Sequence, residues 1–181
     1  WKTKNQVPNS YQKDGIILKI MTNKSHQKPE ISISTSSEDE TQEKAKVLGE
    51  YIRKGDLILL SGDLGAGKTR FVQGLTMGIN SSQIARSPTF VLITEYSGNI
   101  TLFHCDLYRI DKPEEVIDLE LDELLDTGAL AVEWPENGGN YMPNPDLIIY
   151  TIINGKNSRQ LNYFSYSERG KNLIKYIKKN I

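Results

Sequence analysis

The sequence predicts a single α/β domain built on a mixed β-sheet. Its 181 residues, 38% of them hydrophobic and 25% charged, have the size and composition of one globular domain. Short apolar runs of strand type alternate with segments of helical period, which is typical of the α/β class. A turn-like stretch at residues 96–100 separates two apolar runs, so we expect two neighbouring strands to pair antiparallel in an otherwise largely parallel sheet.

The domain is expected to begin with a strand, a helix and a second strand. Isoleucines alternate with serines at residues 31–35, as in a short strand. Ser37, followed three residues later by Glu40, has the spacing of a capping box and predicts a helix start. Gly55 is expected to end this helix, and the apolar run at 56–61 predicts a buried strand. The helix presents one apolar face, made of Thr41, Ala45, Leu48 and Ile52.

The later elements continue the alternation of strands and helices. We expect a helix at 69–78 and an acidic amphipathic helix at 113–125. Further strands are expected at 90–96, 100–105, 129–132 and 147–153. The last helix should carry lysines opposite an apolar face of Leu173, Ile174, Ile177 and Ile181.

Charge is unevenly distributed along the chain. The formal net charge is −1, but residues 30–168 hold 22 of the 23 acidic residues and only 11 of the 22 basic ones. An acidic body repels polyanions, so it argues against direct nucleic-acid binding by the core. The single cysteine, Cys105, excludes an internal disulfide and a cysteine-based zinc site. No apolar run is long enough to cross a bilayer, and we expect a cytoplasmic protein that does not bind membranes.

These shifts in composition predict three segments. Residues 1–30 show no sustained period, and we expect a disordered or non-native extension with Met21 as the natural start. Residues 31–168 form the predicted domain, and residues 169–181 form a basic terminal helix.

The motif that decides the function class is a phosphate-binding loop. Residues 62–69 match G-x-x-x-x-G-K-[ST] at every defined position, and they follow a predicted strand and precede a predicted helix. Glycines let successive N–H groups point at phosphate oxygens, and the start of the helix adds its positive end. Lys68 contributes a positive charge, and the Thr69 hydroxyl is a ligand for Mg²⁺. The sequence therefore predicts a P-loop NTPase-like three-layer fold that binds a nucleoside triphosphate.

The base is expected to be adenine. GTPases commonly read guanine with an Asn-Lys-x-Asp segment, which this chain lacks, since residues 154–157 contain no acid. ATP and Mg²⁺ are therefore the expected cofactors.

Two carboxylates end predicted strands and are candidates for the metal and the water. The apolar run at 129–132 ends in Glu133, as in a Walker-B strand, and the run at 102–105 ends in Asp106. One acid holds Mg²⁺, directly or through water, and the other orients or deprotonates the attacking water. The residues alone leave this division open.

Four blocks of the sequence together resemble one family. They are the loop at 62–69, Ser-Pro-Thr-Phe at 87–90, His-Cys-Asp-Leu-Tyr-Arg at 104–109, and Glu-Trp-Pro-Glu at 133–136. The chain is similar over residues 31–165 to the TsaE family (formerly YjeE), bacterial ATPases needed for threonylcarbamoyladenosine in tRNA. One departure is Glu120, which stands between two leucines where the family often carries a glycine.

The resemblance implies roles for individual residues. Thr69 and Glu133 would serve Mg²⁺, and Asp106 would be the catalytic acid, assisted by Lys68. Thr89 would approach the γ-phosphate, and Trp134 would lie beside the nucleotide. The phosphates would be wrapped by Asp63, Leu64, Gly65, Ala66, Gly67, Lys68 and Thr69.

Two further positions align more loosely, and several residues keep a structural alternative. Arg159 would lie close to the nucleotide or be a surface arginine, and Thr41 would lie near the adenine. The segment around Thr89 is alternatively a proline-set turn, and Trp134 a buried core indole. His104 is interpreted as a hydrogen-bonded packing histidine, and Cys105 as a small core residue on the opposite face.

The resemblance further implies Mg²⁺-dependent ATP hydrolysis that supports the TsaB–TsaD pair in modifying adenosine 37 of tRNA. TsaD and TsaB would be the partners, and tRNA would be met only through their complex. Two alternatives remain open: an ATP-gated protein-binding switch with negligible hydrolysis, and a small-molecule kinase.

Overall fold

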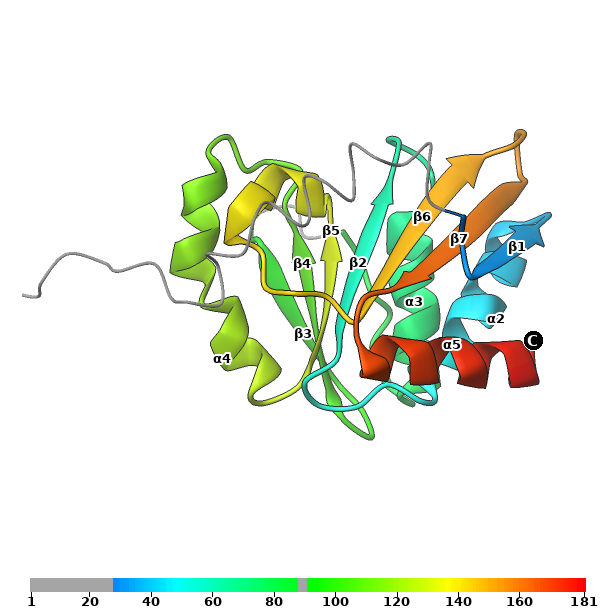
Figure 1. Cartoon of the computed structure of the whole chain (residues 1–181), viewed down its shortest axis with the longest axis horizontal. Coiled ribbons are helices and arrows are strands. Elements are labelled where there is room, and N and C mark those ends of the chain that lie inside the picture. The colour runs from blue at the N-terminus through cyan, green and yellow to red at the C-terminus, as the bar shows by residue number, and fades with distance from the viewer. Residues whose placement is uncertain (1–27, 88–90) are drawn as a thin grey trace, which may run out of the picture.

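The computed structural model describes residues 28–87 and 91–181, which form one seven-stranded sheet with helices on both faces (Figure 1). The spatial order of the strands is β1-β7-β6-β2-β5-β4-β3. The predicted extension at 1–30 lies almost wholly outside the described residues, as does the predicted contact of Thr89. The strands are β1 (Ile31–Thr35), β2 (Leu57–Gly62), β3 (Ile93–Ser97), β4 (Thr101–Asp106), β5 (Ala129–Glu133), β6 (Leu147–Ile153) and β7 (Arg159–Ser165).

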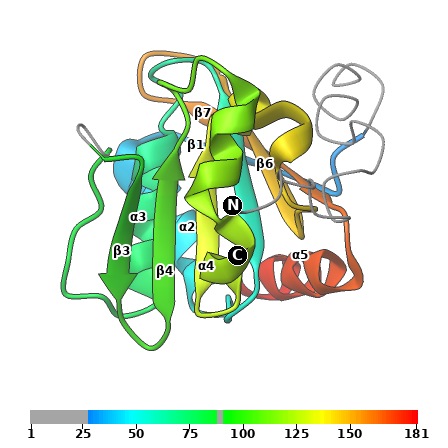
Figure 2. The same ribbon diagram turned by 90° about the vertical axis from the view of Figure 1, so that its left-hand side faces the viewer.

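The sheet is mixed, with most strands running in one direction. The four central strands β4, β5, β2 and β6 pair parallel to one another, while β7 pairs antiparallel to β6 and to β1. β3 pairs antiparallel to β4, and Figure 2 shows these two arrows pointing in opposite directions. The expected turn at 96–100 therefore joins an antiparallel pair, and the predicted mixed, largely parallel sheet is confirmed.

Two apolar cores, one on each face, make the fold three-layered. The first core joins one face of the sheet to α2 (Glu38–Gly49), α3 (Lys68–Gly78) and α5 (Glu168–Asn180). The second core lies under the 3₁₀ helix η2 (Pro113–Leu119), α4 (Leu121–Leu125) and the 3₁₀ helix η3 (Pro135–Tyr141). β2 is buried along its whole length between the two layers, as its continuous apolar sequence predicts.

The N-cap of α2 is Ser37, as predicted, but the helix ends before the predicted residue. The Ser37 side chain accepts a hydrogen bond from the Glu40 N–H, whereas the Glu40 carboxylate turns to Ser36 instead of completing the box with Ser37. The helix ends at Gly49 and not at Gly55, because Gly55 belongs to the turn before β2, with φ of +89°. The predicted apolar face is buried throughout.

The predicted helix over 113–125 is interrupted. Glu120 adopts a left-handed conformation, with φ of 49° and ψ of 45°, and separates η2 from α4. A residue in this conformation cannot continue a right-handed helix, so the acidic segment forms two short pieces. The prediction of one helix over 113–125 was wrong, because apolar periodicity does not indicate a left-handed residue inside the segment.

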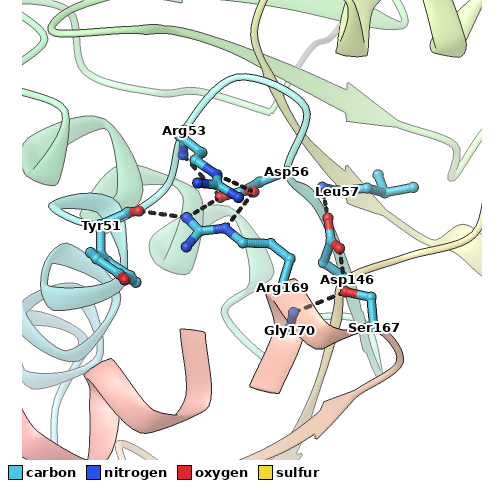
Figure 3. Close-up of polar contacts among 8 residues, drawn as sticks. All are labelled: Tyr51, Arg53, Asp56, Leu57, Asp146, Ser167, Arg169 and Gly170. Carbon is cyan, nitrogen blue, oxygen red and sulfur yellow. Dashed lines mark hydrogen bonds and ion pairs between the residues drawn. The ribbon is translucent and has the colours of Figure 1, made fainter. Parts of the chain in front are cut away.

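The terminal helix α5 is tied to the start of β2 (Figure 3). The Arg169 guanidinium donates to both oxygens of the buried Asp56 carboxylate, at 2.8 Å and 2.7 Å. Asp146 accepts from the Leu57 N–H and from the Ser167 hydroxyl that caps α5. Three of the predicted apolar residues of α5 are buried, whereas Ile181 follows the helix end and is 43% exposed.

Candidate functional site

Three parallel strands bring the candidate residues to one edge of the sheet. β2 runs into the phosphate-binding loop, while Asp106 ends β4 and Glu133 ends β5. The Cα register pairs Glu133 with Leu60 of β2 and with Asp106 of β4. Because the carboxyl ends of parallel strands meet at the same edge, both predicted acids lie beside the loop, as the sequence predicted.

The loop follows a path that requires glycine. Gly65 and Gly67 have φ of 77° and 97°, in the left-handed region that side chains with a Cβ rarely adopt. Gly67 is also the N-cap of α3, directly before its first residue. Ala66 is buried beneath the loop, and its N–H donates to the Asp63 carbonyl at 3.0 Å. The main chain is therefore curled, as a phosphate-binding loop must be.

Lys68 is held inside this curl. Its side chain is almost fully buried, and Nζ donates to the carbonyls of Gly62 at 2.7 Å and Asp63 at 3.0 Å. The ammonium lies 3.6 Å from the centre of a Trp134 ring. Burial lowers the pKa of Lys68, and nearby carboxylates oppose this by favouring its charged form. The carboxylates belong to Glu133, Glu136, Asp106 and Asp63.

Thr69 and Glu133, the predicted Mg²⁺ ligands, are in direct contact. The Thr69 hydroxyl donates to Glu133 Oε1 at 2.8 Å, so its oxygen lone pairs stay free. Within residues 28–87 and 91–181, no cluster of three or more His, Cys, Asp or Glu side chains forms a metal cage. One hydroxyl with one carboxylate fits Mg²⁺, which binds nucleotide enzymes through few protein ligands together with phosphates and water.

Asp106 is buried, and donors reach both oxygens of its carboxylate. The Ser87 hydroxyl donates to Oδ2 at 2.8 Å, and the Tyr108 N–H donates to Oδ1 at 3.0 Å. Ser87 precedes the segment that carries Thr89, which lies outside the described residues. The two donors hold Asp106 in one orientation at the edge of the sheet.

These side chains share one cavity of about 530 Å³. The volume lies within the range of small-molecule sites. It brings together the loop, α3, both acids and Trp134. Its lining is Glu38, Leu64, Gly65, Gly67, Lys68, Thr69, Arg70, Gln73, Arg86, Ser87, Asp106, Tyr108, Glu133 and Trp134.

Thr41 and Arg159 line a second, smaller cavity of about 30 Å³ that shares Gly65 and Gly67 with the first. The Arg159 guanidinium donates to the Ala66 carbonyl at 3.1 Å and to the Gly65 carbonyl at 3.2 Å. Arg159 therefore braces the phosphate-binding loop from β7, which a simple surface arginine does not do. The Thr41 hydroxyl is buried and donates to the Ser37 carbonyl at 3.0 Å.

Trp134 lies between the second core and the large cavity. It packs against the second core, and it also lines the large cavity beside Lys68. Its φ of 56° is left-handed, and its ring lies 5.0 Å from that of Tyr108. A tryptophan in this strained conformation at a cavity wall favours a functional role over simple packing.

Sequence reasoning missed several lining residues. Glu38 of α2 and Arg70 of α3, 32 residues apart along the chain, form an ion pair of 2.7 Å and line the cavity, and no local pattern reports such a contact. Ser87 and Tyr108 stand inside the quoted blocks, so a signal was present for them. Cys105 faces the opposite core as predicted, where burial raises the pKa of its thiol to about 12.

Comparison with known proteins gives the family of the chain. The sequence profile of the family described as threonylcarbamoyl adenosine biosynthesis protein TsaE matches residues 35–161. The chain belongs to the TsaE family. The match spans the loop, both acids and Arg159, and it places the chain among proteins of threonylcarbamoyladenosine biosynthesis.

Several TsaE proteins resemble the chain over most of its length. The Nostoc protein is 43% identical over 121 residues, covering 63% of this chain and 73% of its own. The Bacillus subtilis protein is 36% identical over 137 residues, covering 75% and 85%. The crystal structure of Bacillus subtilis YdiB superposes with a TM-score of 0.72 at 30% identity, covering 82% of this chain and 94% of that one. The three-layer α/β fold is thereby confirmed.

The helices give no sign of membrane insertion in the part of the chain that the structure describes. None of them is both long enough and apolar enough to cross a bilayer.

Proposed function

We propose that this TsaE protein hydrolyses ATP with Mg²⁺ and thereby supports threonylcarbamoyladenosine formation at position 37 of tRNA. The observation that carries the proposal is the convergence of Lys68, Thr69, Asp106 and Glu133 on one cavity beside a curled glycine loop. The names of the TsaE relatives support the tRNA pathway.

The first step is binding of the triphosphate. Main-chain N–H groups between Leu64 and Thr69 and the start of α3 favour an anion at this place. Lys68 Nζ, now bonded to the loop's own carbonyls, supplies the positive charge for the phosphates. Thr69 and Glu133 would hold Mg²⁺, which neutralises charge that develops on the phosphate oxygens.

Asp106 is the residue proposed to act on the attacking water. Its carboxylate is held by Ser87 and Tyr108, and an oriented acceptor at the cavity wall can align a water or take its proton. Either role needs the Asp106 carboxylate beside the phosphates and separate from Thr69 and Glu133, the proposed Mg²⁺ ligands. In the described part of the chain, Asp106 and Glu133 have different hydrogen-bond partners and do not bond to each other.

The base and the partners follow from weaker observations. We assign adenine because the chain has no guanine-reading Asn-Lys-x-Asp segment, and the cavity of Thr41 and Arg159 shares Gly65 and Gly67 of the phosphate-binding loop. The acidic body argues for protein partners, for which TsaD and TsaB are proposed, with tRNA met through their complex. The proposed place of action is the cytoplasm.

The deciding experiment measures phosphate release from ATP with and without the TsaB–TsaD pair. Stimulated release supports the proposal. Tight ATP binding without turnover would instead identify an ATP-gated switch, and transfer of the phosphoryl group to a metabolite would identify a kinase.

Two variants separate binding from hydrolysis. Lys68→Ala should abolish ATP binding, because it removes the buried cation from the loop. Asp106→Ala should keep ATP binding and lower the hydrolysis rate by about 10²–10⁴-fold. Titration of a fluorescent ATP analogue and phosphate release measure the two quantities, with Asp118→Ala, an exposed acid on η2, as control. Normal turnover by Asp106→Ala would remove this residue from the mechanism.

A further inference from the structure

Besides Thr69, the side chain of His104 contacts the Glu133 carboxylate. His104 Nε2 lies 2.9 Å from Glu133 Oε1, the same oxygen that accepts from the Thr69 hydroxyl. The His104 side chain is fully buried, and that of Glu133 is 4% exposed. A carboxylate removed from water in this way depends on its few protein donors.

The hydrogen-bond pattern indicates which ring nitrogen of His104 carries the proton. Nδ1 is buried and has no hydrogen-bond partner among the described residues. A proton there would be a buried donor without an acceptor, whereas a proton on Nε2 meets the carboxylate. The geometry therefore favours a proton on Nε2, which faces the carboxylate.

The sheet register explains why a histidine fits at this position. His104 pairs with Ala131 in the β4–β5 ladder, two residues before the pair formed by Asp106 and Glu133. Residues two apart point to the same face of a strand, so the imidazole lies over the small alanine and reaches the glutamate along the sheet. The centre of the Tyr96 ring lies 6.4 Å from that of the imidazole.

We propose that His104 is a positioning residue for Glu133. Its Nε2–H and the Thr69 hydroxyl fix Oε1 from two directions, which leaves Oε2 without a donor in the described structure and available to Mg²⁺ or to a water bound to it. Hydrogen bonds from an outer residue orient a metal ligand and raise metal affinity in this way. The inference rests on the proposed Mg²⁺-ATP site and assigns His104 a part in it beyond packing.

The protonation state can be read without any nucleotide. The chain has only two histidines, His26 and His104, so a ¹⁵N-histidine spectrum contains two imidazoles, which a His26→Asn variant assigns. At pH 7.5 the signals of His104 should show a proton on Nε2 alone. A proton on Nδ1 would overturn the inference.

The functional test measures the Mg²⁺-dependent part of ATP affinity. Titration of the full chain with ATP, once with Mg²⁺ and once with EDTA, yields the factor by which the metal strengthens binding. His104→Leu should reduce this factor about tenfold and leave the affinity in EDTA unchanged. His104→Gln places an amide donor near the position of Nε2 and should restore most of the factor.

Leu102→Ala is the matched control for a loss of stability. Leu102 is buried on the same face of β4, two residues before His104, and does not bond to Glu133. It should lower the melting temperature and keep the Mg²⁺ factor. A His104→Leu protein that also keeps the factor would show that His104 only packs. Absence of any Mg²⁺ factor in the unmodified protein would instead refute the proposed function.

Discussion

Glu120 occupies a backbone conformation that suits glycine better than glutamate. Its φ of 49° places the backbone in the left-handed region, where the Cβ of an L-residue crowds the following carbonyl at a cost of about 1–2 kcal/mol. The chain nevertheless turns here, because the conformation lets η2 stop and α4 begin.

Replacement of this residue tests the strain directly. Glu120→Gly should raise the free energy of unfolding by about 0.5–1 kcal/mol, because relief of strain exceeds the added freedom of the unfolded chain. Urea denaturation measures the change. Glu120→Ala keeps the Cβ and is the control, which should gain little. Equal gains from both variants would contradict the explanation by strain.

Helices α2 and α3 pack closely because glycines line their contact. A Cβ on Gly74 would lie 2.3 Å from the Gln42 carbonyl oxygen, and one on Gly78 would lie 2.4 Å from that of Lys46. Such distances leave no space for a methyl group against backbone. Since α3 begins at Lys68, this contact also sets the position of the phosphate-binding residues.

Gly74→Ala should therefore destabilise the protein, although alanine favours helices. Forcing a methyl group against backbone costs about 1–3 kcal/mol, and the helix preference returns only about 1 kcal/mol. ATP affinity should fall as well, because α3 must move away from α2. Thermal unfolding and ATP titration measure both effects. Gly155→Ala, whose added methyl group meets only the movable Ser158 hydroxyl, is the control and should retain both properties.

The two ends of β2 serve different purposes in the molecule. Its first residue follows Asp56, which binds α5, and its last residue begins the phosphate-binding loop. The six-residue strand separates them by about 20 Å. In Figure 1, α5 lies at the lower end of the sheet, and the arrows of β2 and β5 point away from it. The Asp56–Arg169 ion pair, here called the anchor of α5, therefore lies at the opposite end of β2 from the candidate site.

Loss of the Asp56–Arg169 ion pair should lower the free energy of unfolding and leave ATP affinity unchanged. Arg169→Met removes the 2.7 Å ion pair of the buried Asp56 carboxylate, which then retains the Arg53 N–H and the exposed Arg53 guanidinium at 4.0 Å, and it should cost roughly 3 kcal/mol in the free energy of unfolding. ATP affinity should stay within about twofold, because the anchor lies a strand length from the loop. Lys171→Met, which removes an exposed pair with Glu168 on the same helix, is the control and should change little. A parallel loss of ATP affinity in Arg169→Met would show that the two ends are coupled.

Local signals determined most of what could be read before the fold was known. The loop at 62–69 was evident because its glycines, lysine and threonine stand at fixed spacing, and the buried strands because their apolar runs are continuous. Asp106 and Glu133 were candidates because each directly follows an apolar run. The sequence also carried the TsaE resemblance through its four blocks.

Tertiary structure alone decided which atoms meet. The path of Arg159 to the loop carbonyls, the ion pair of Glu38 and Arg70, and the contact of His104 with Glu133 join residues far apart in the chain. Such contacts depend on strand register and on how closely α2 and α3 approach, which periodicity does not encode. The interruption at Glu120 could not be predicted for a related reason. Charge and apolar spacing indicate which side of a helix is buried, but they do not indicate where one residue adopts a left-handed conformation.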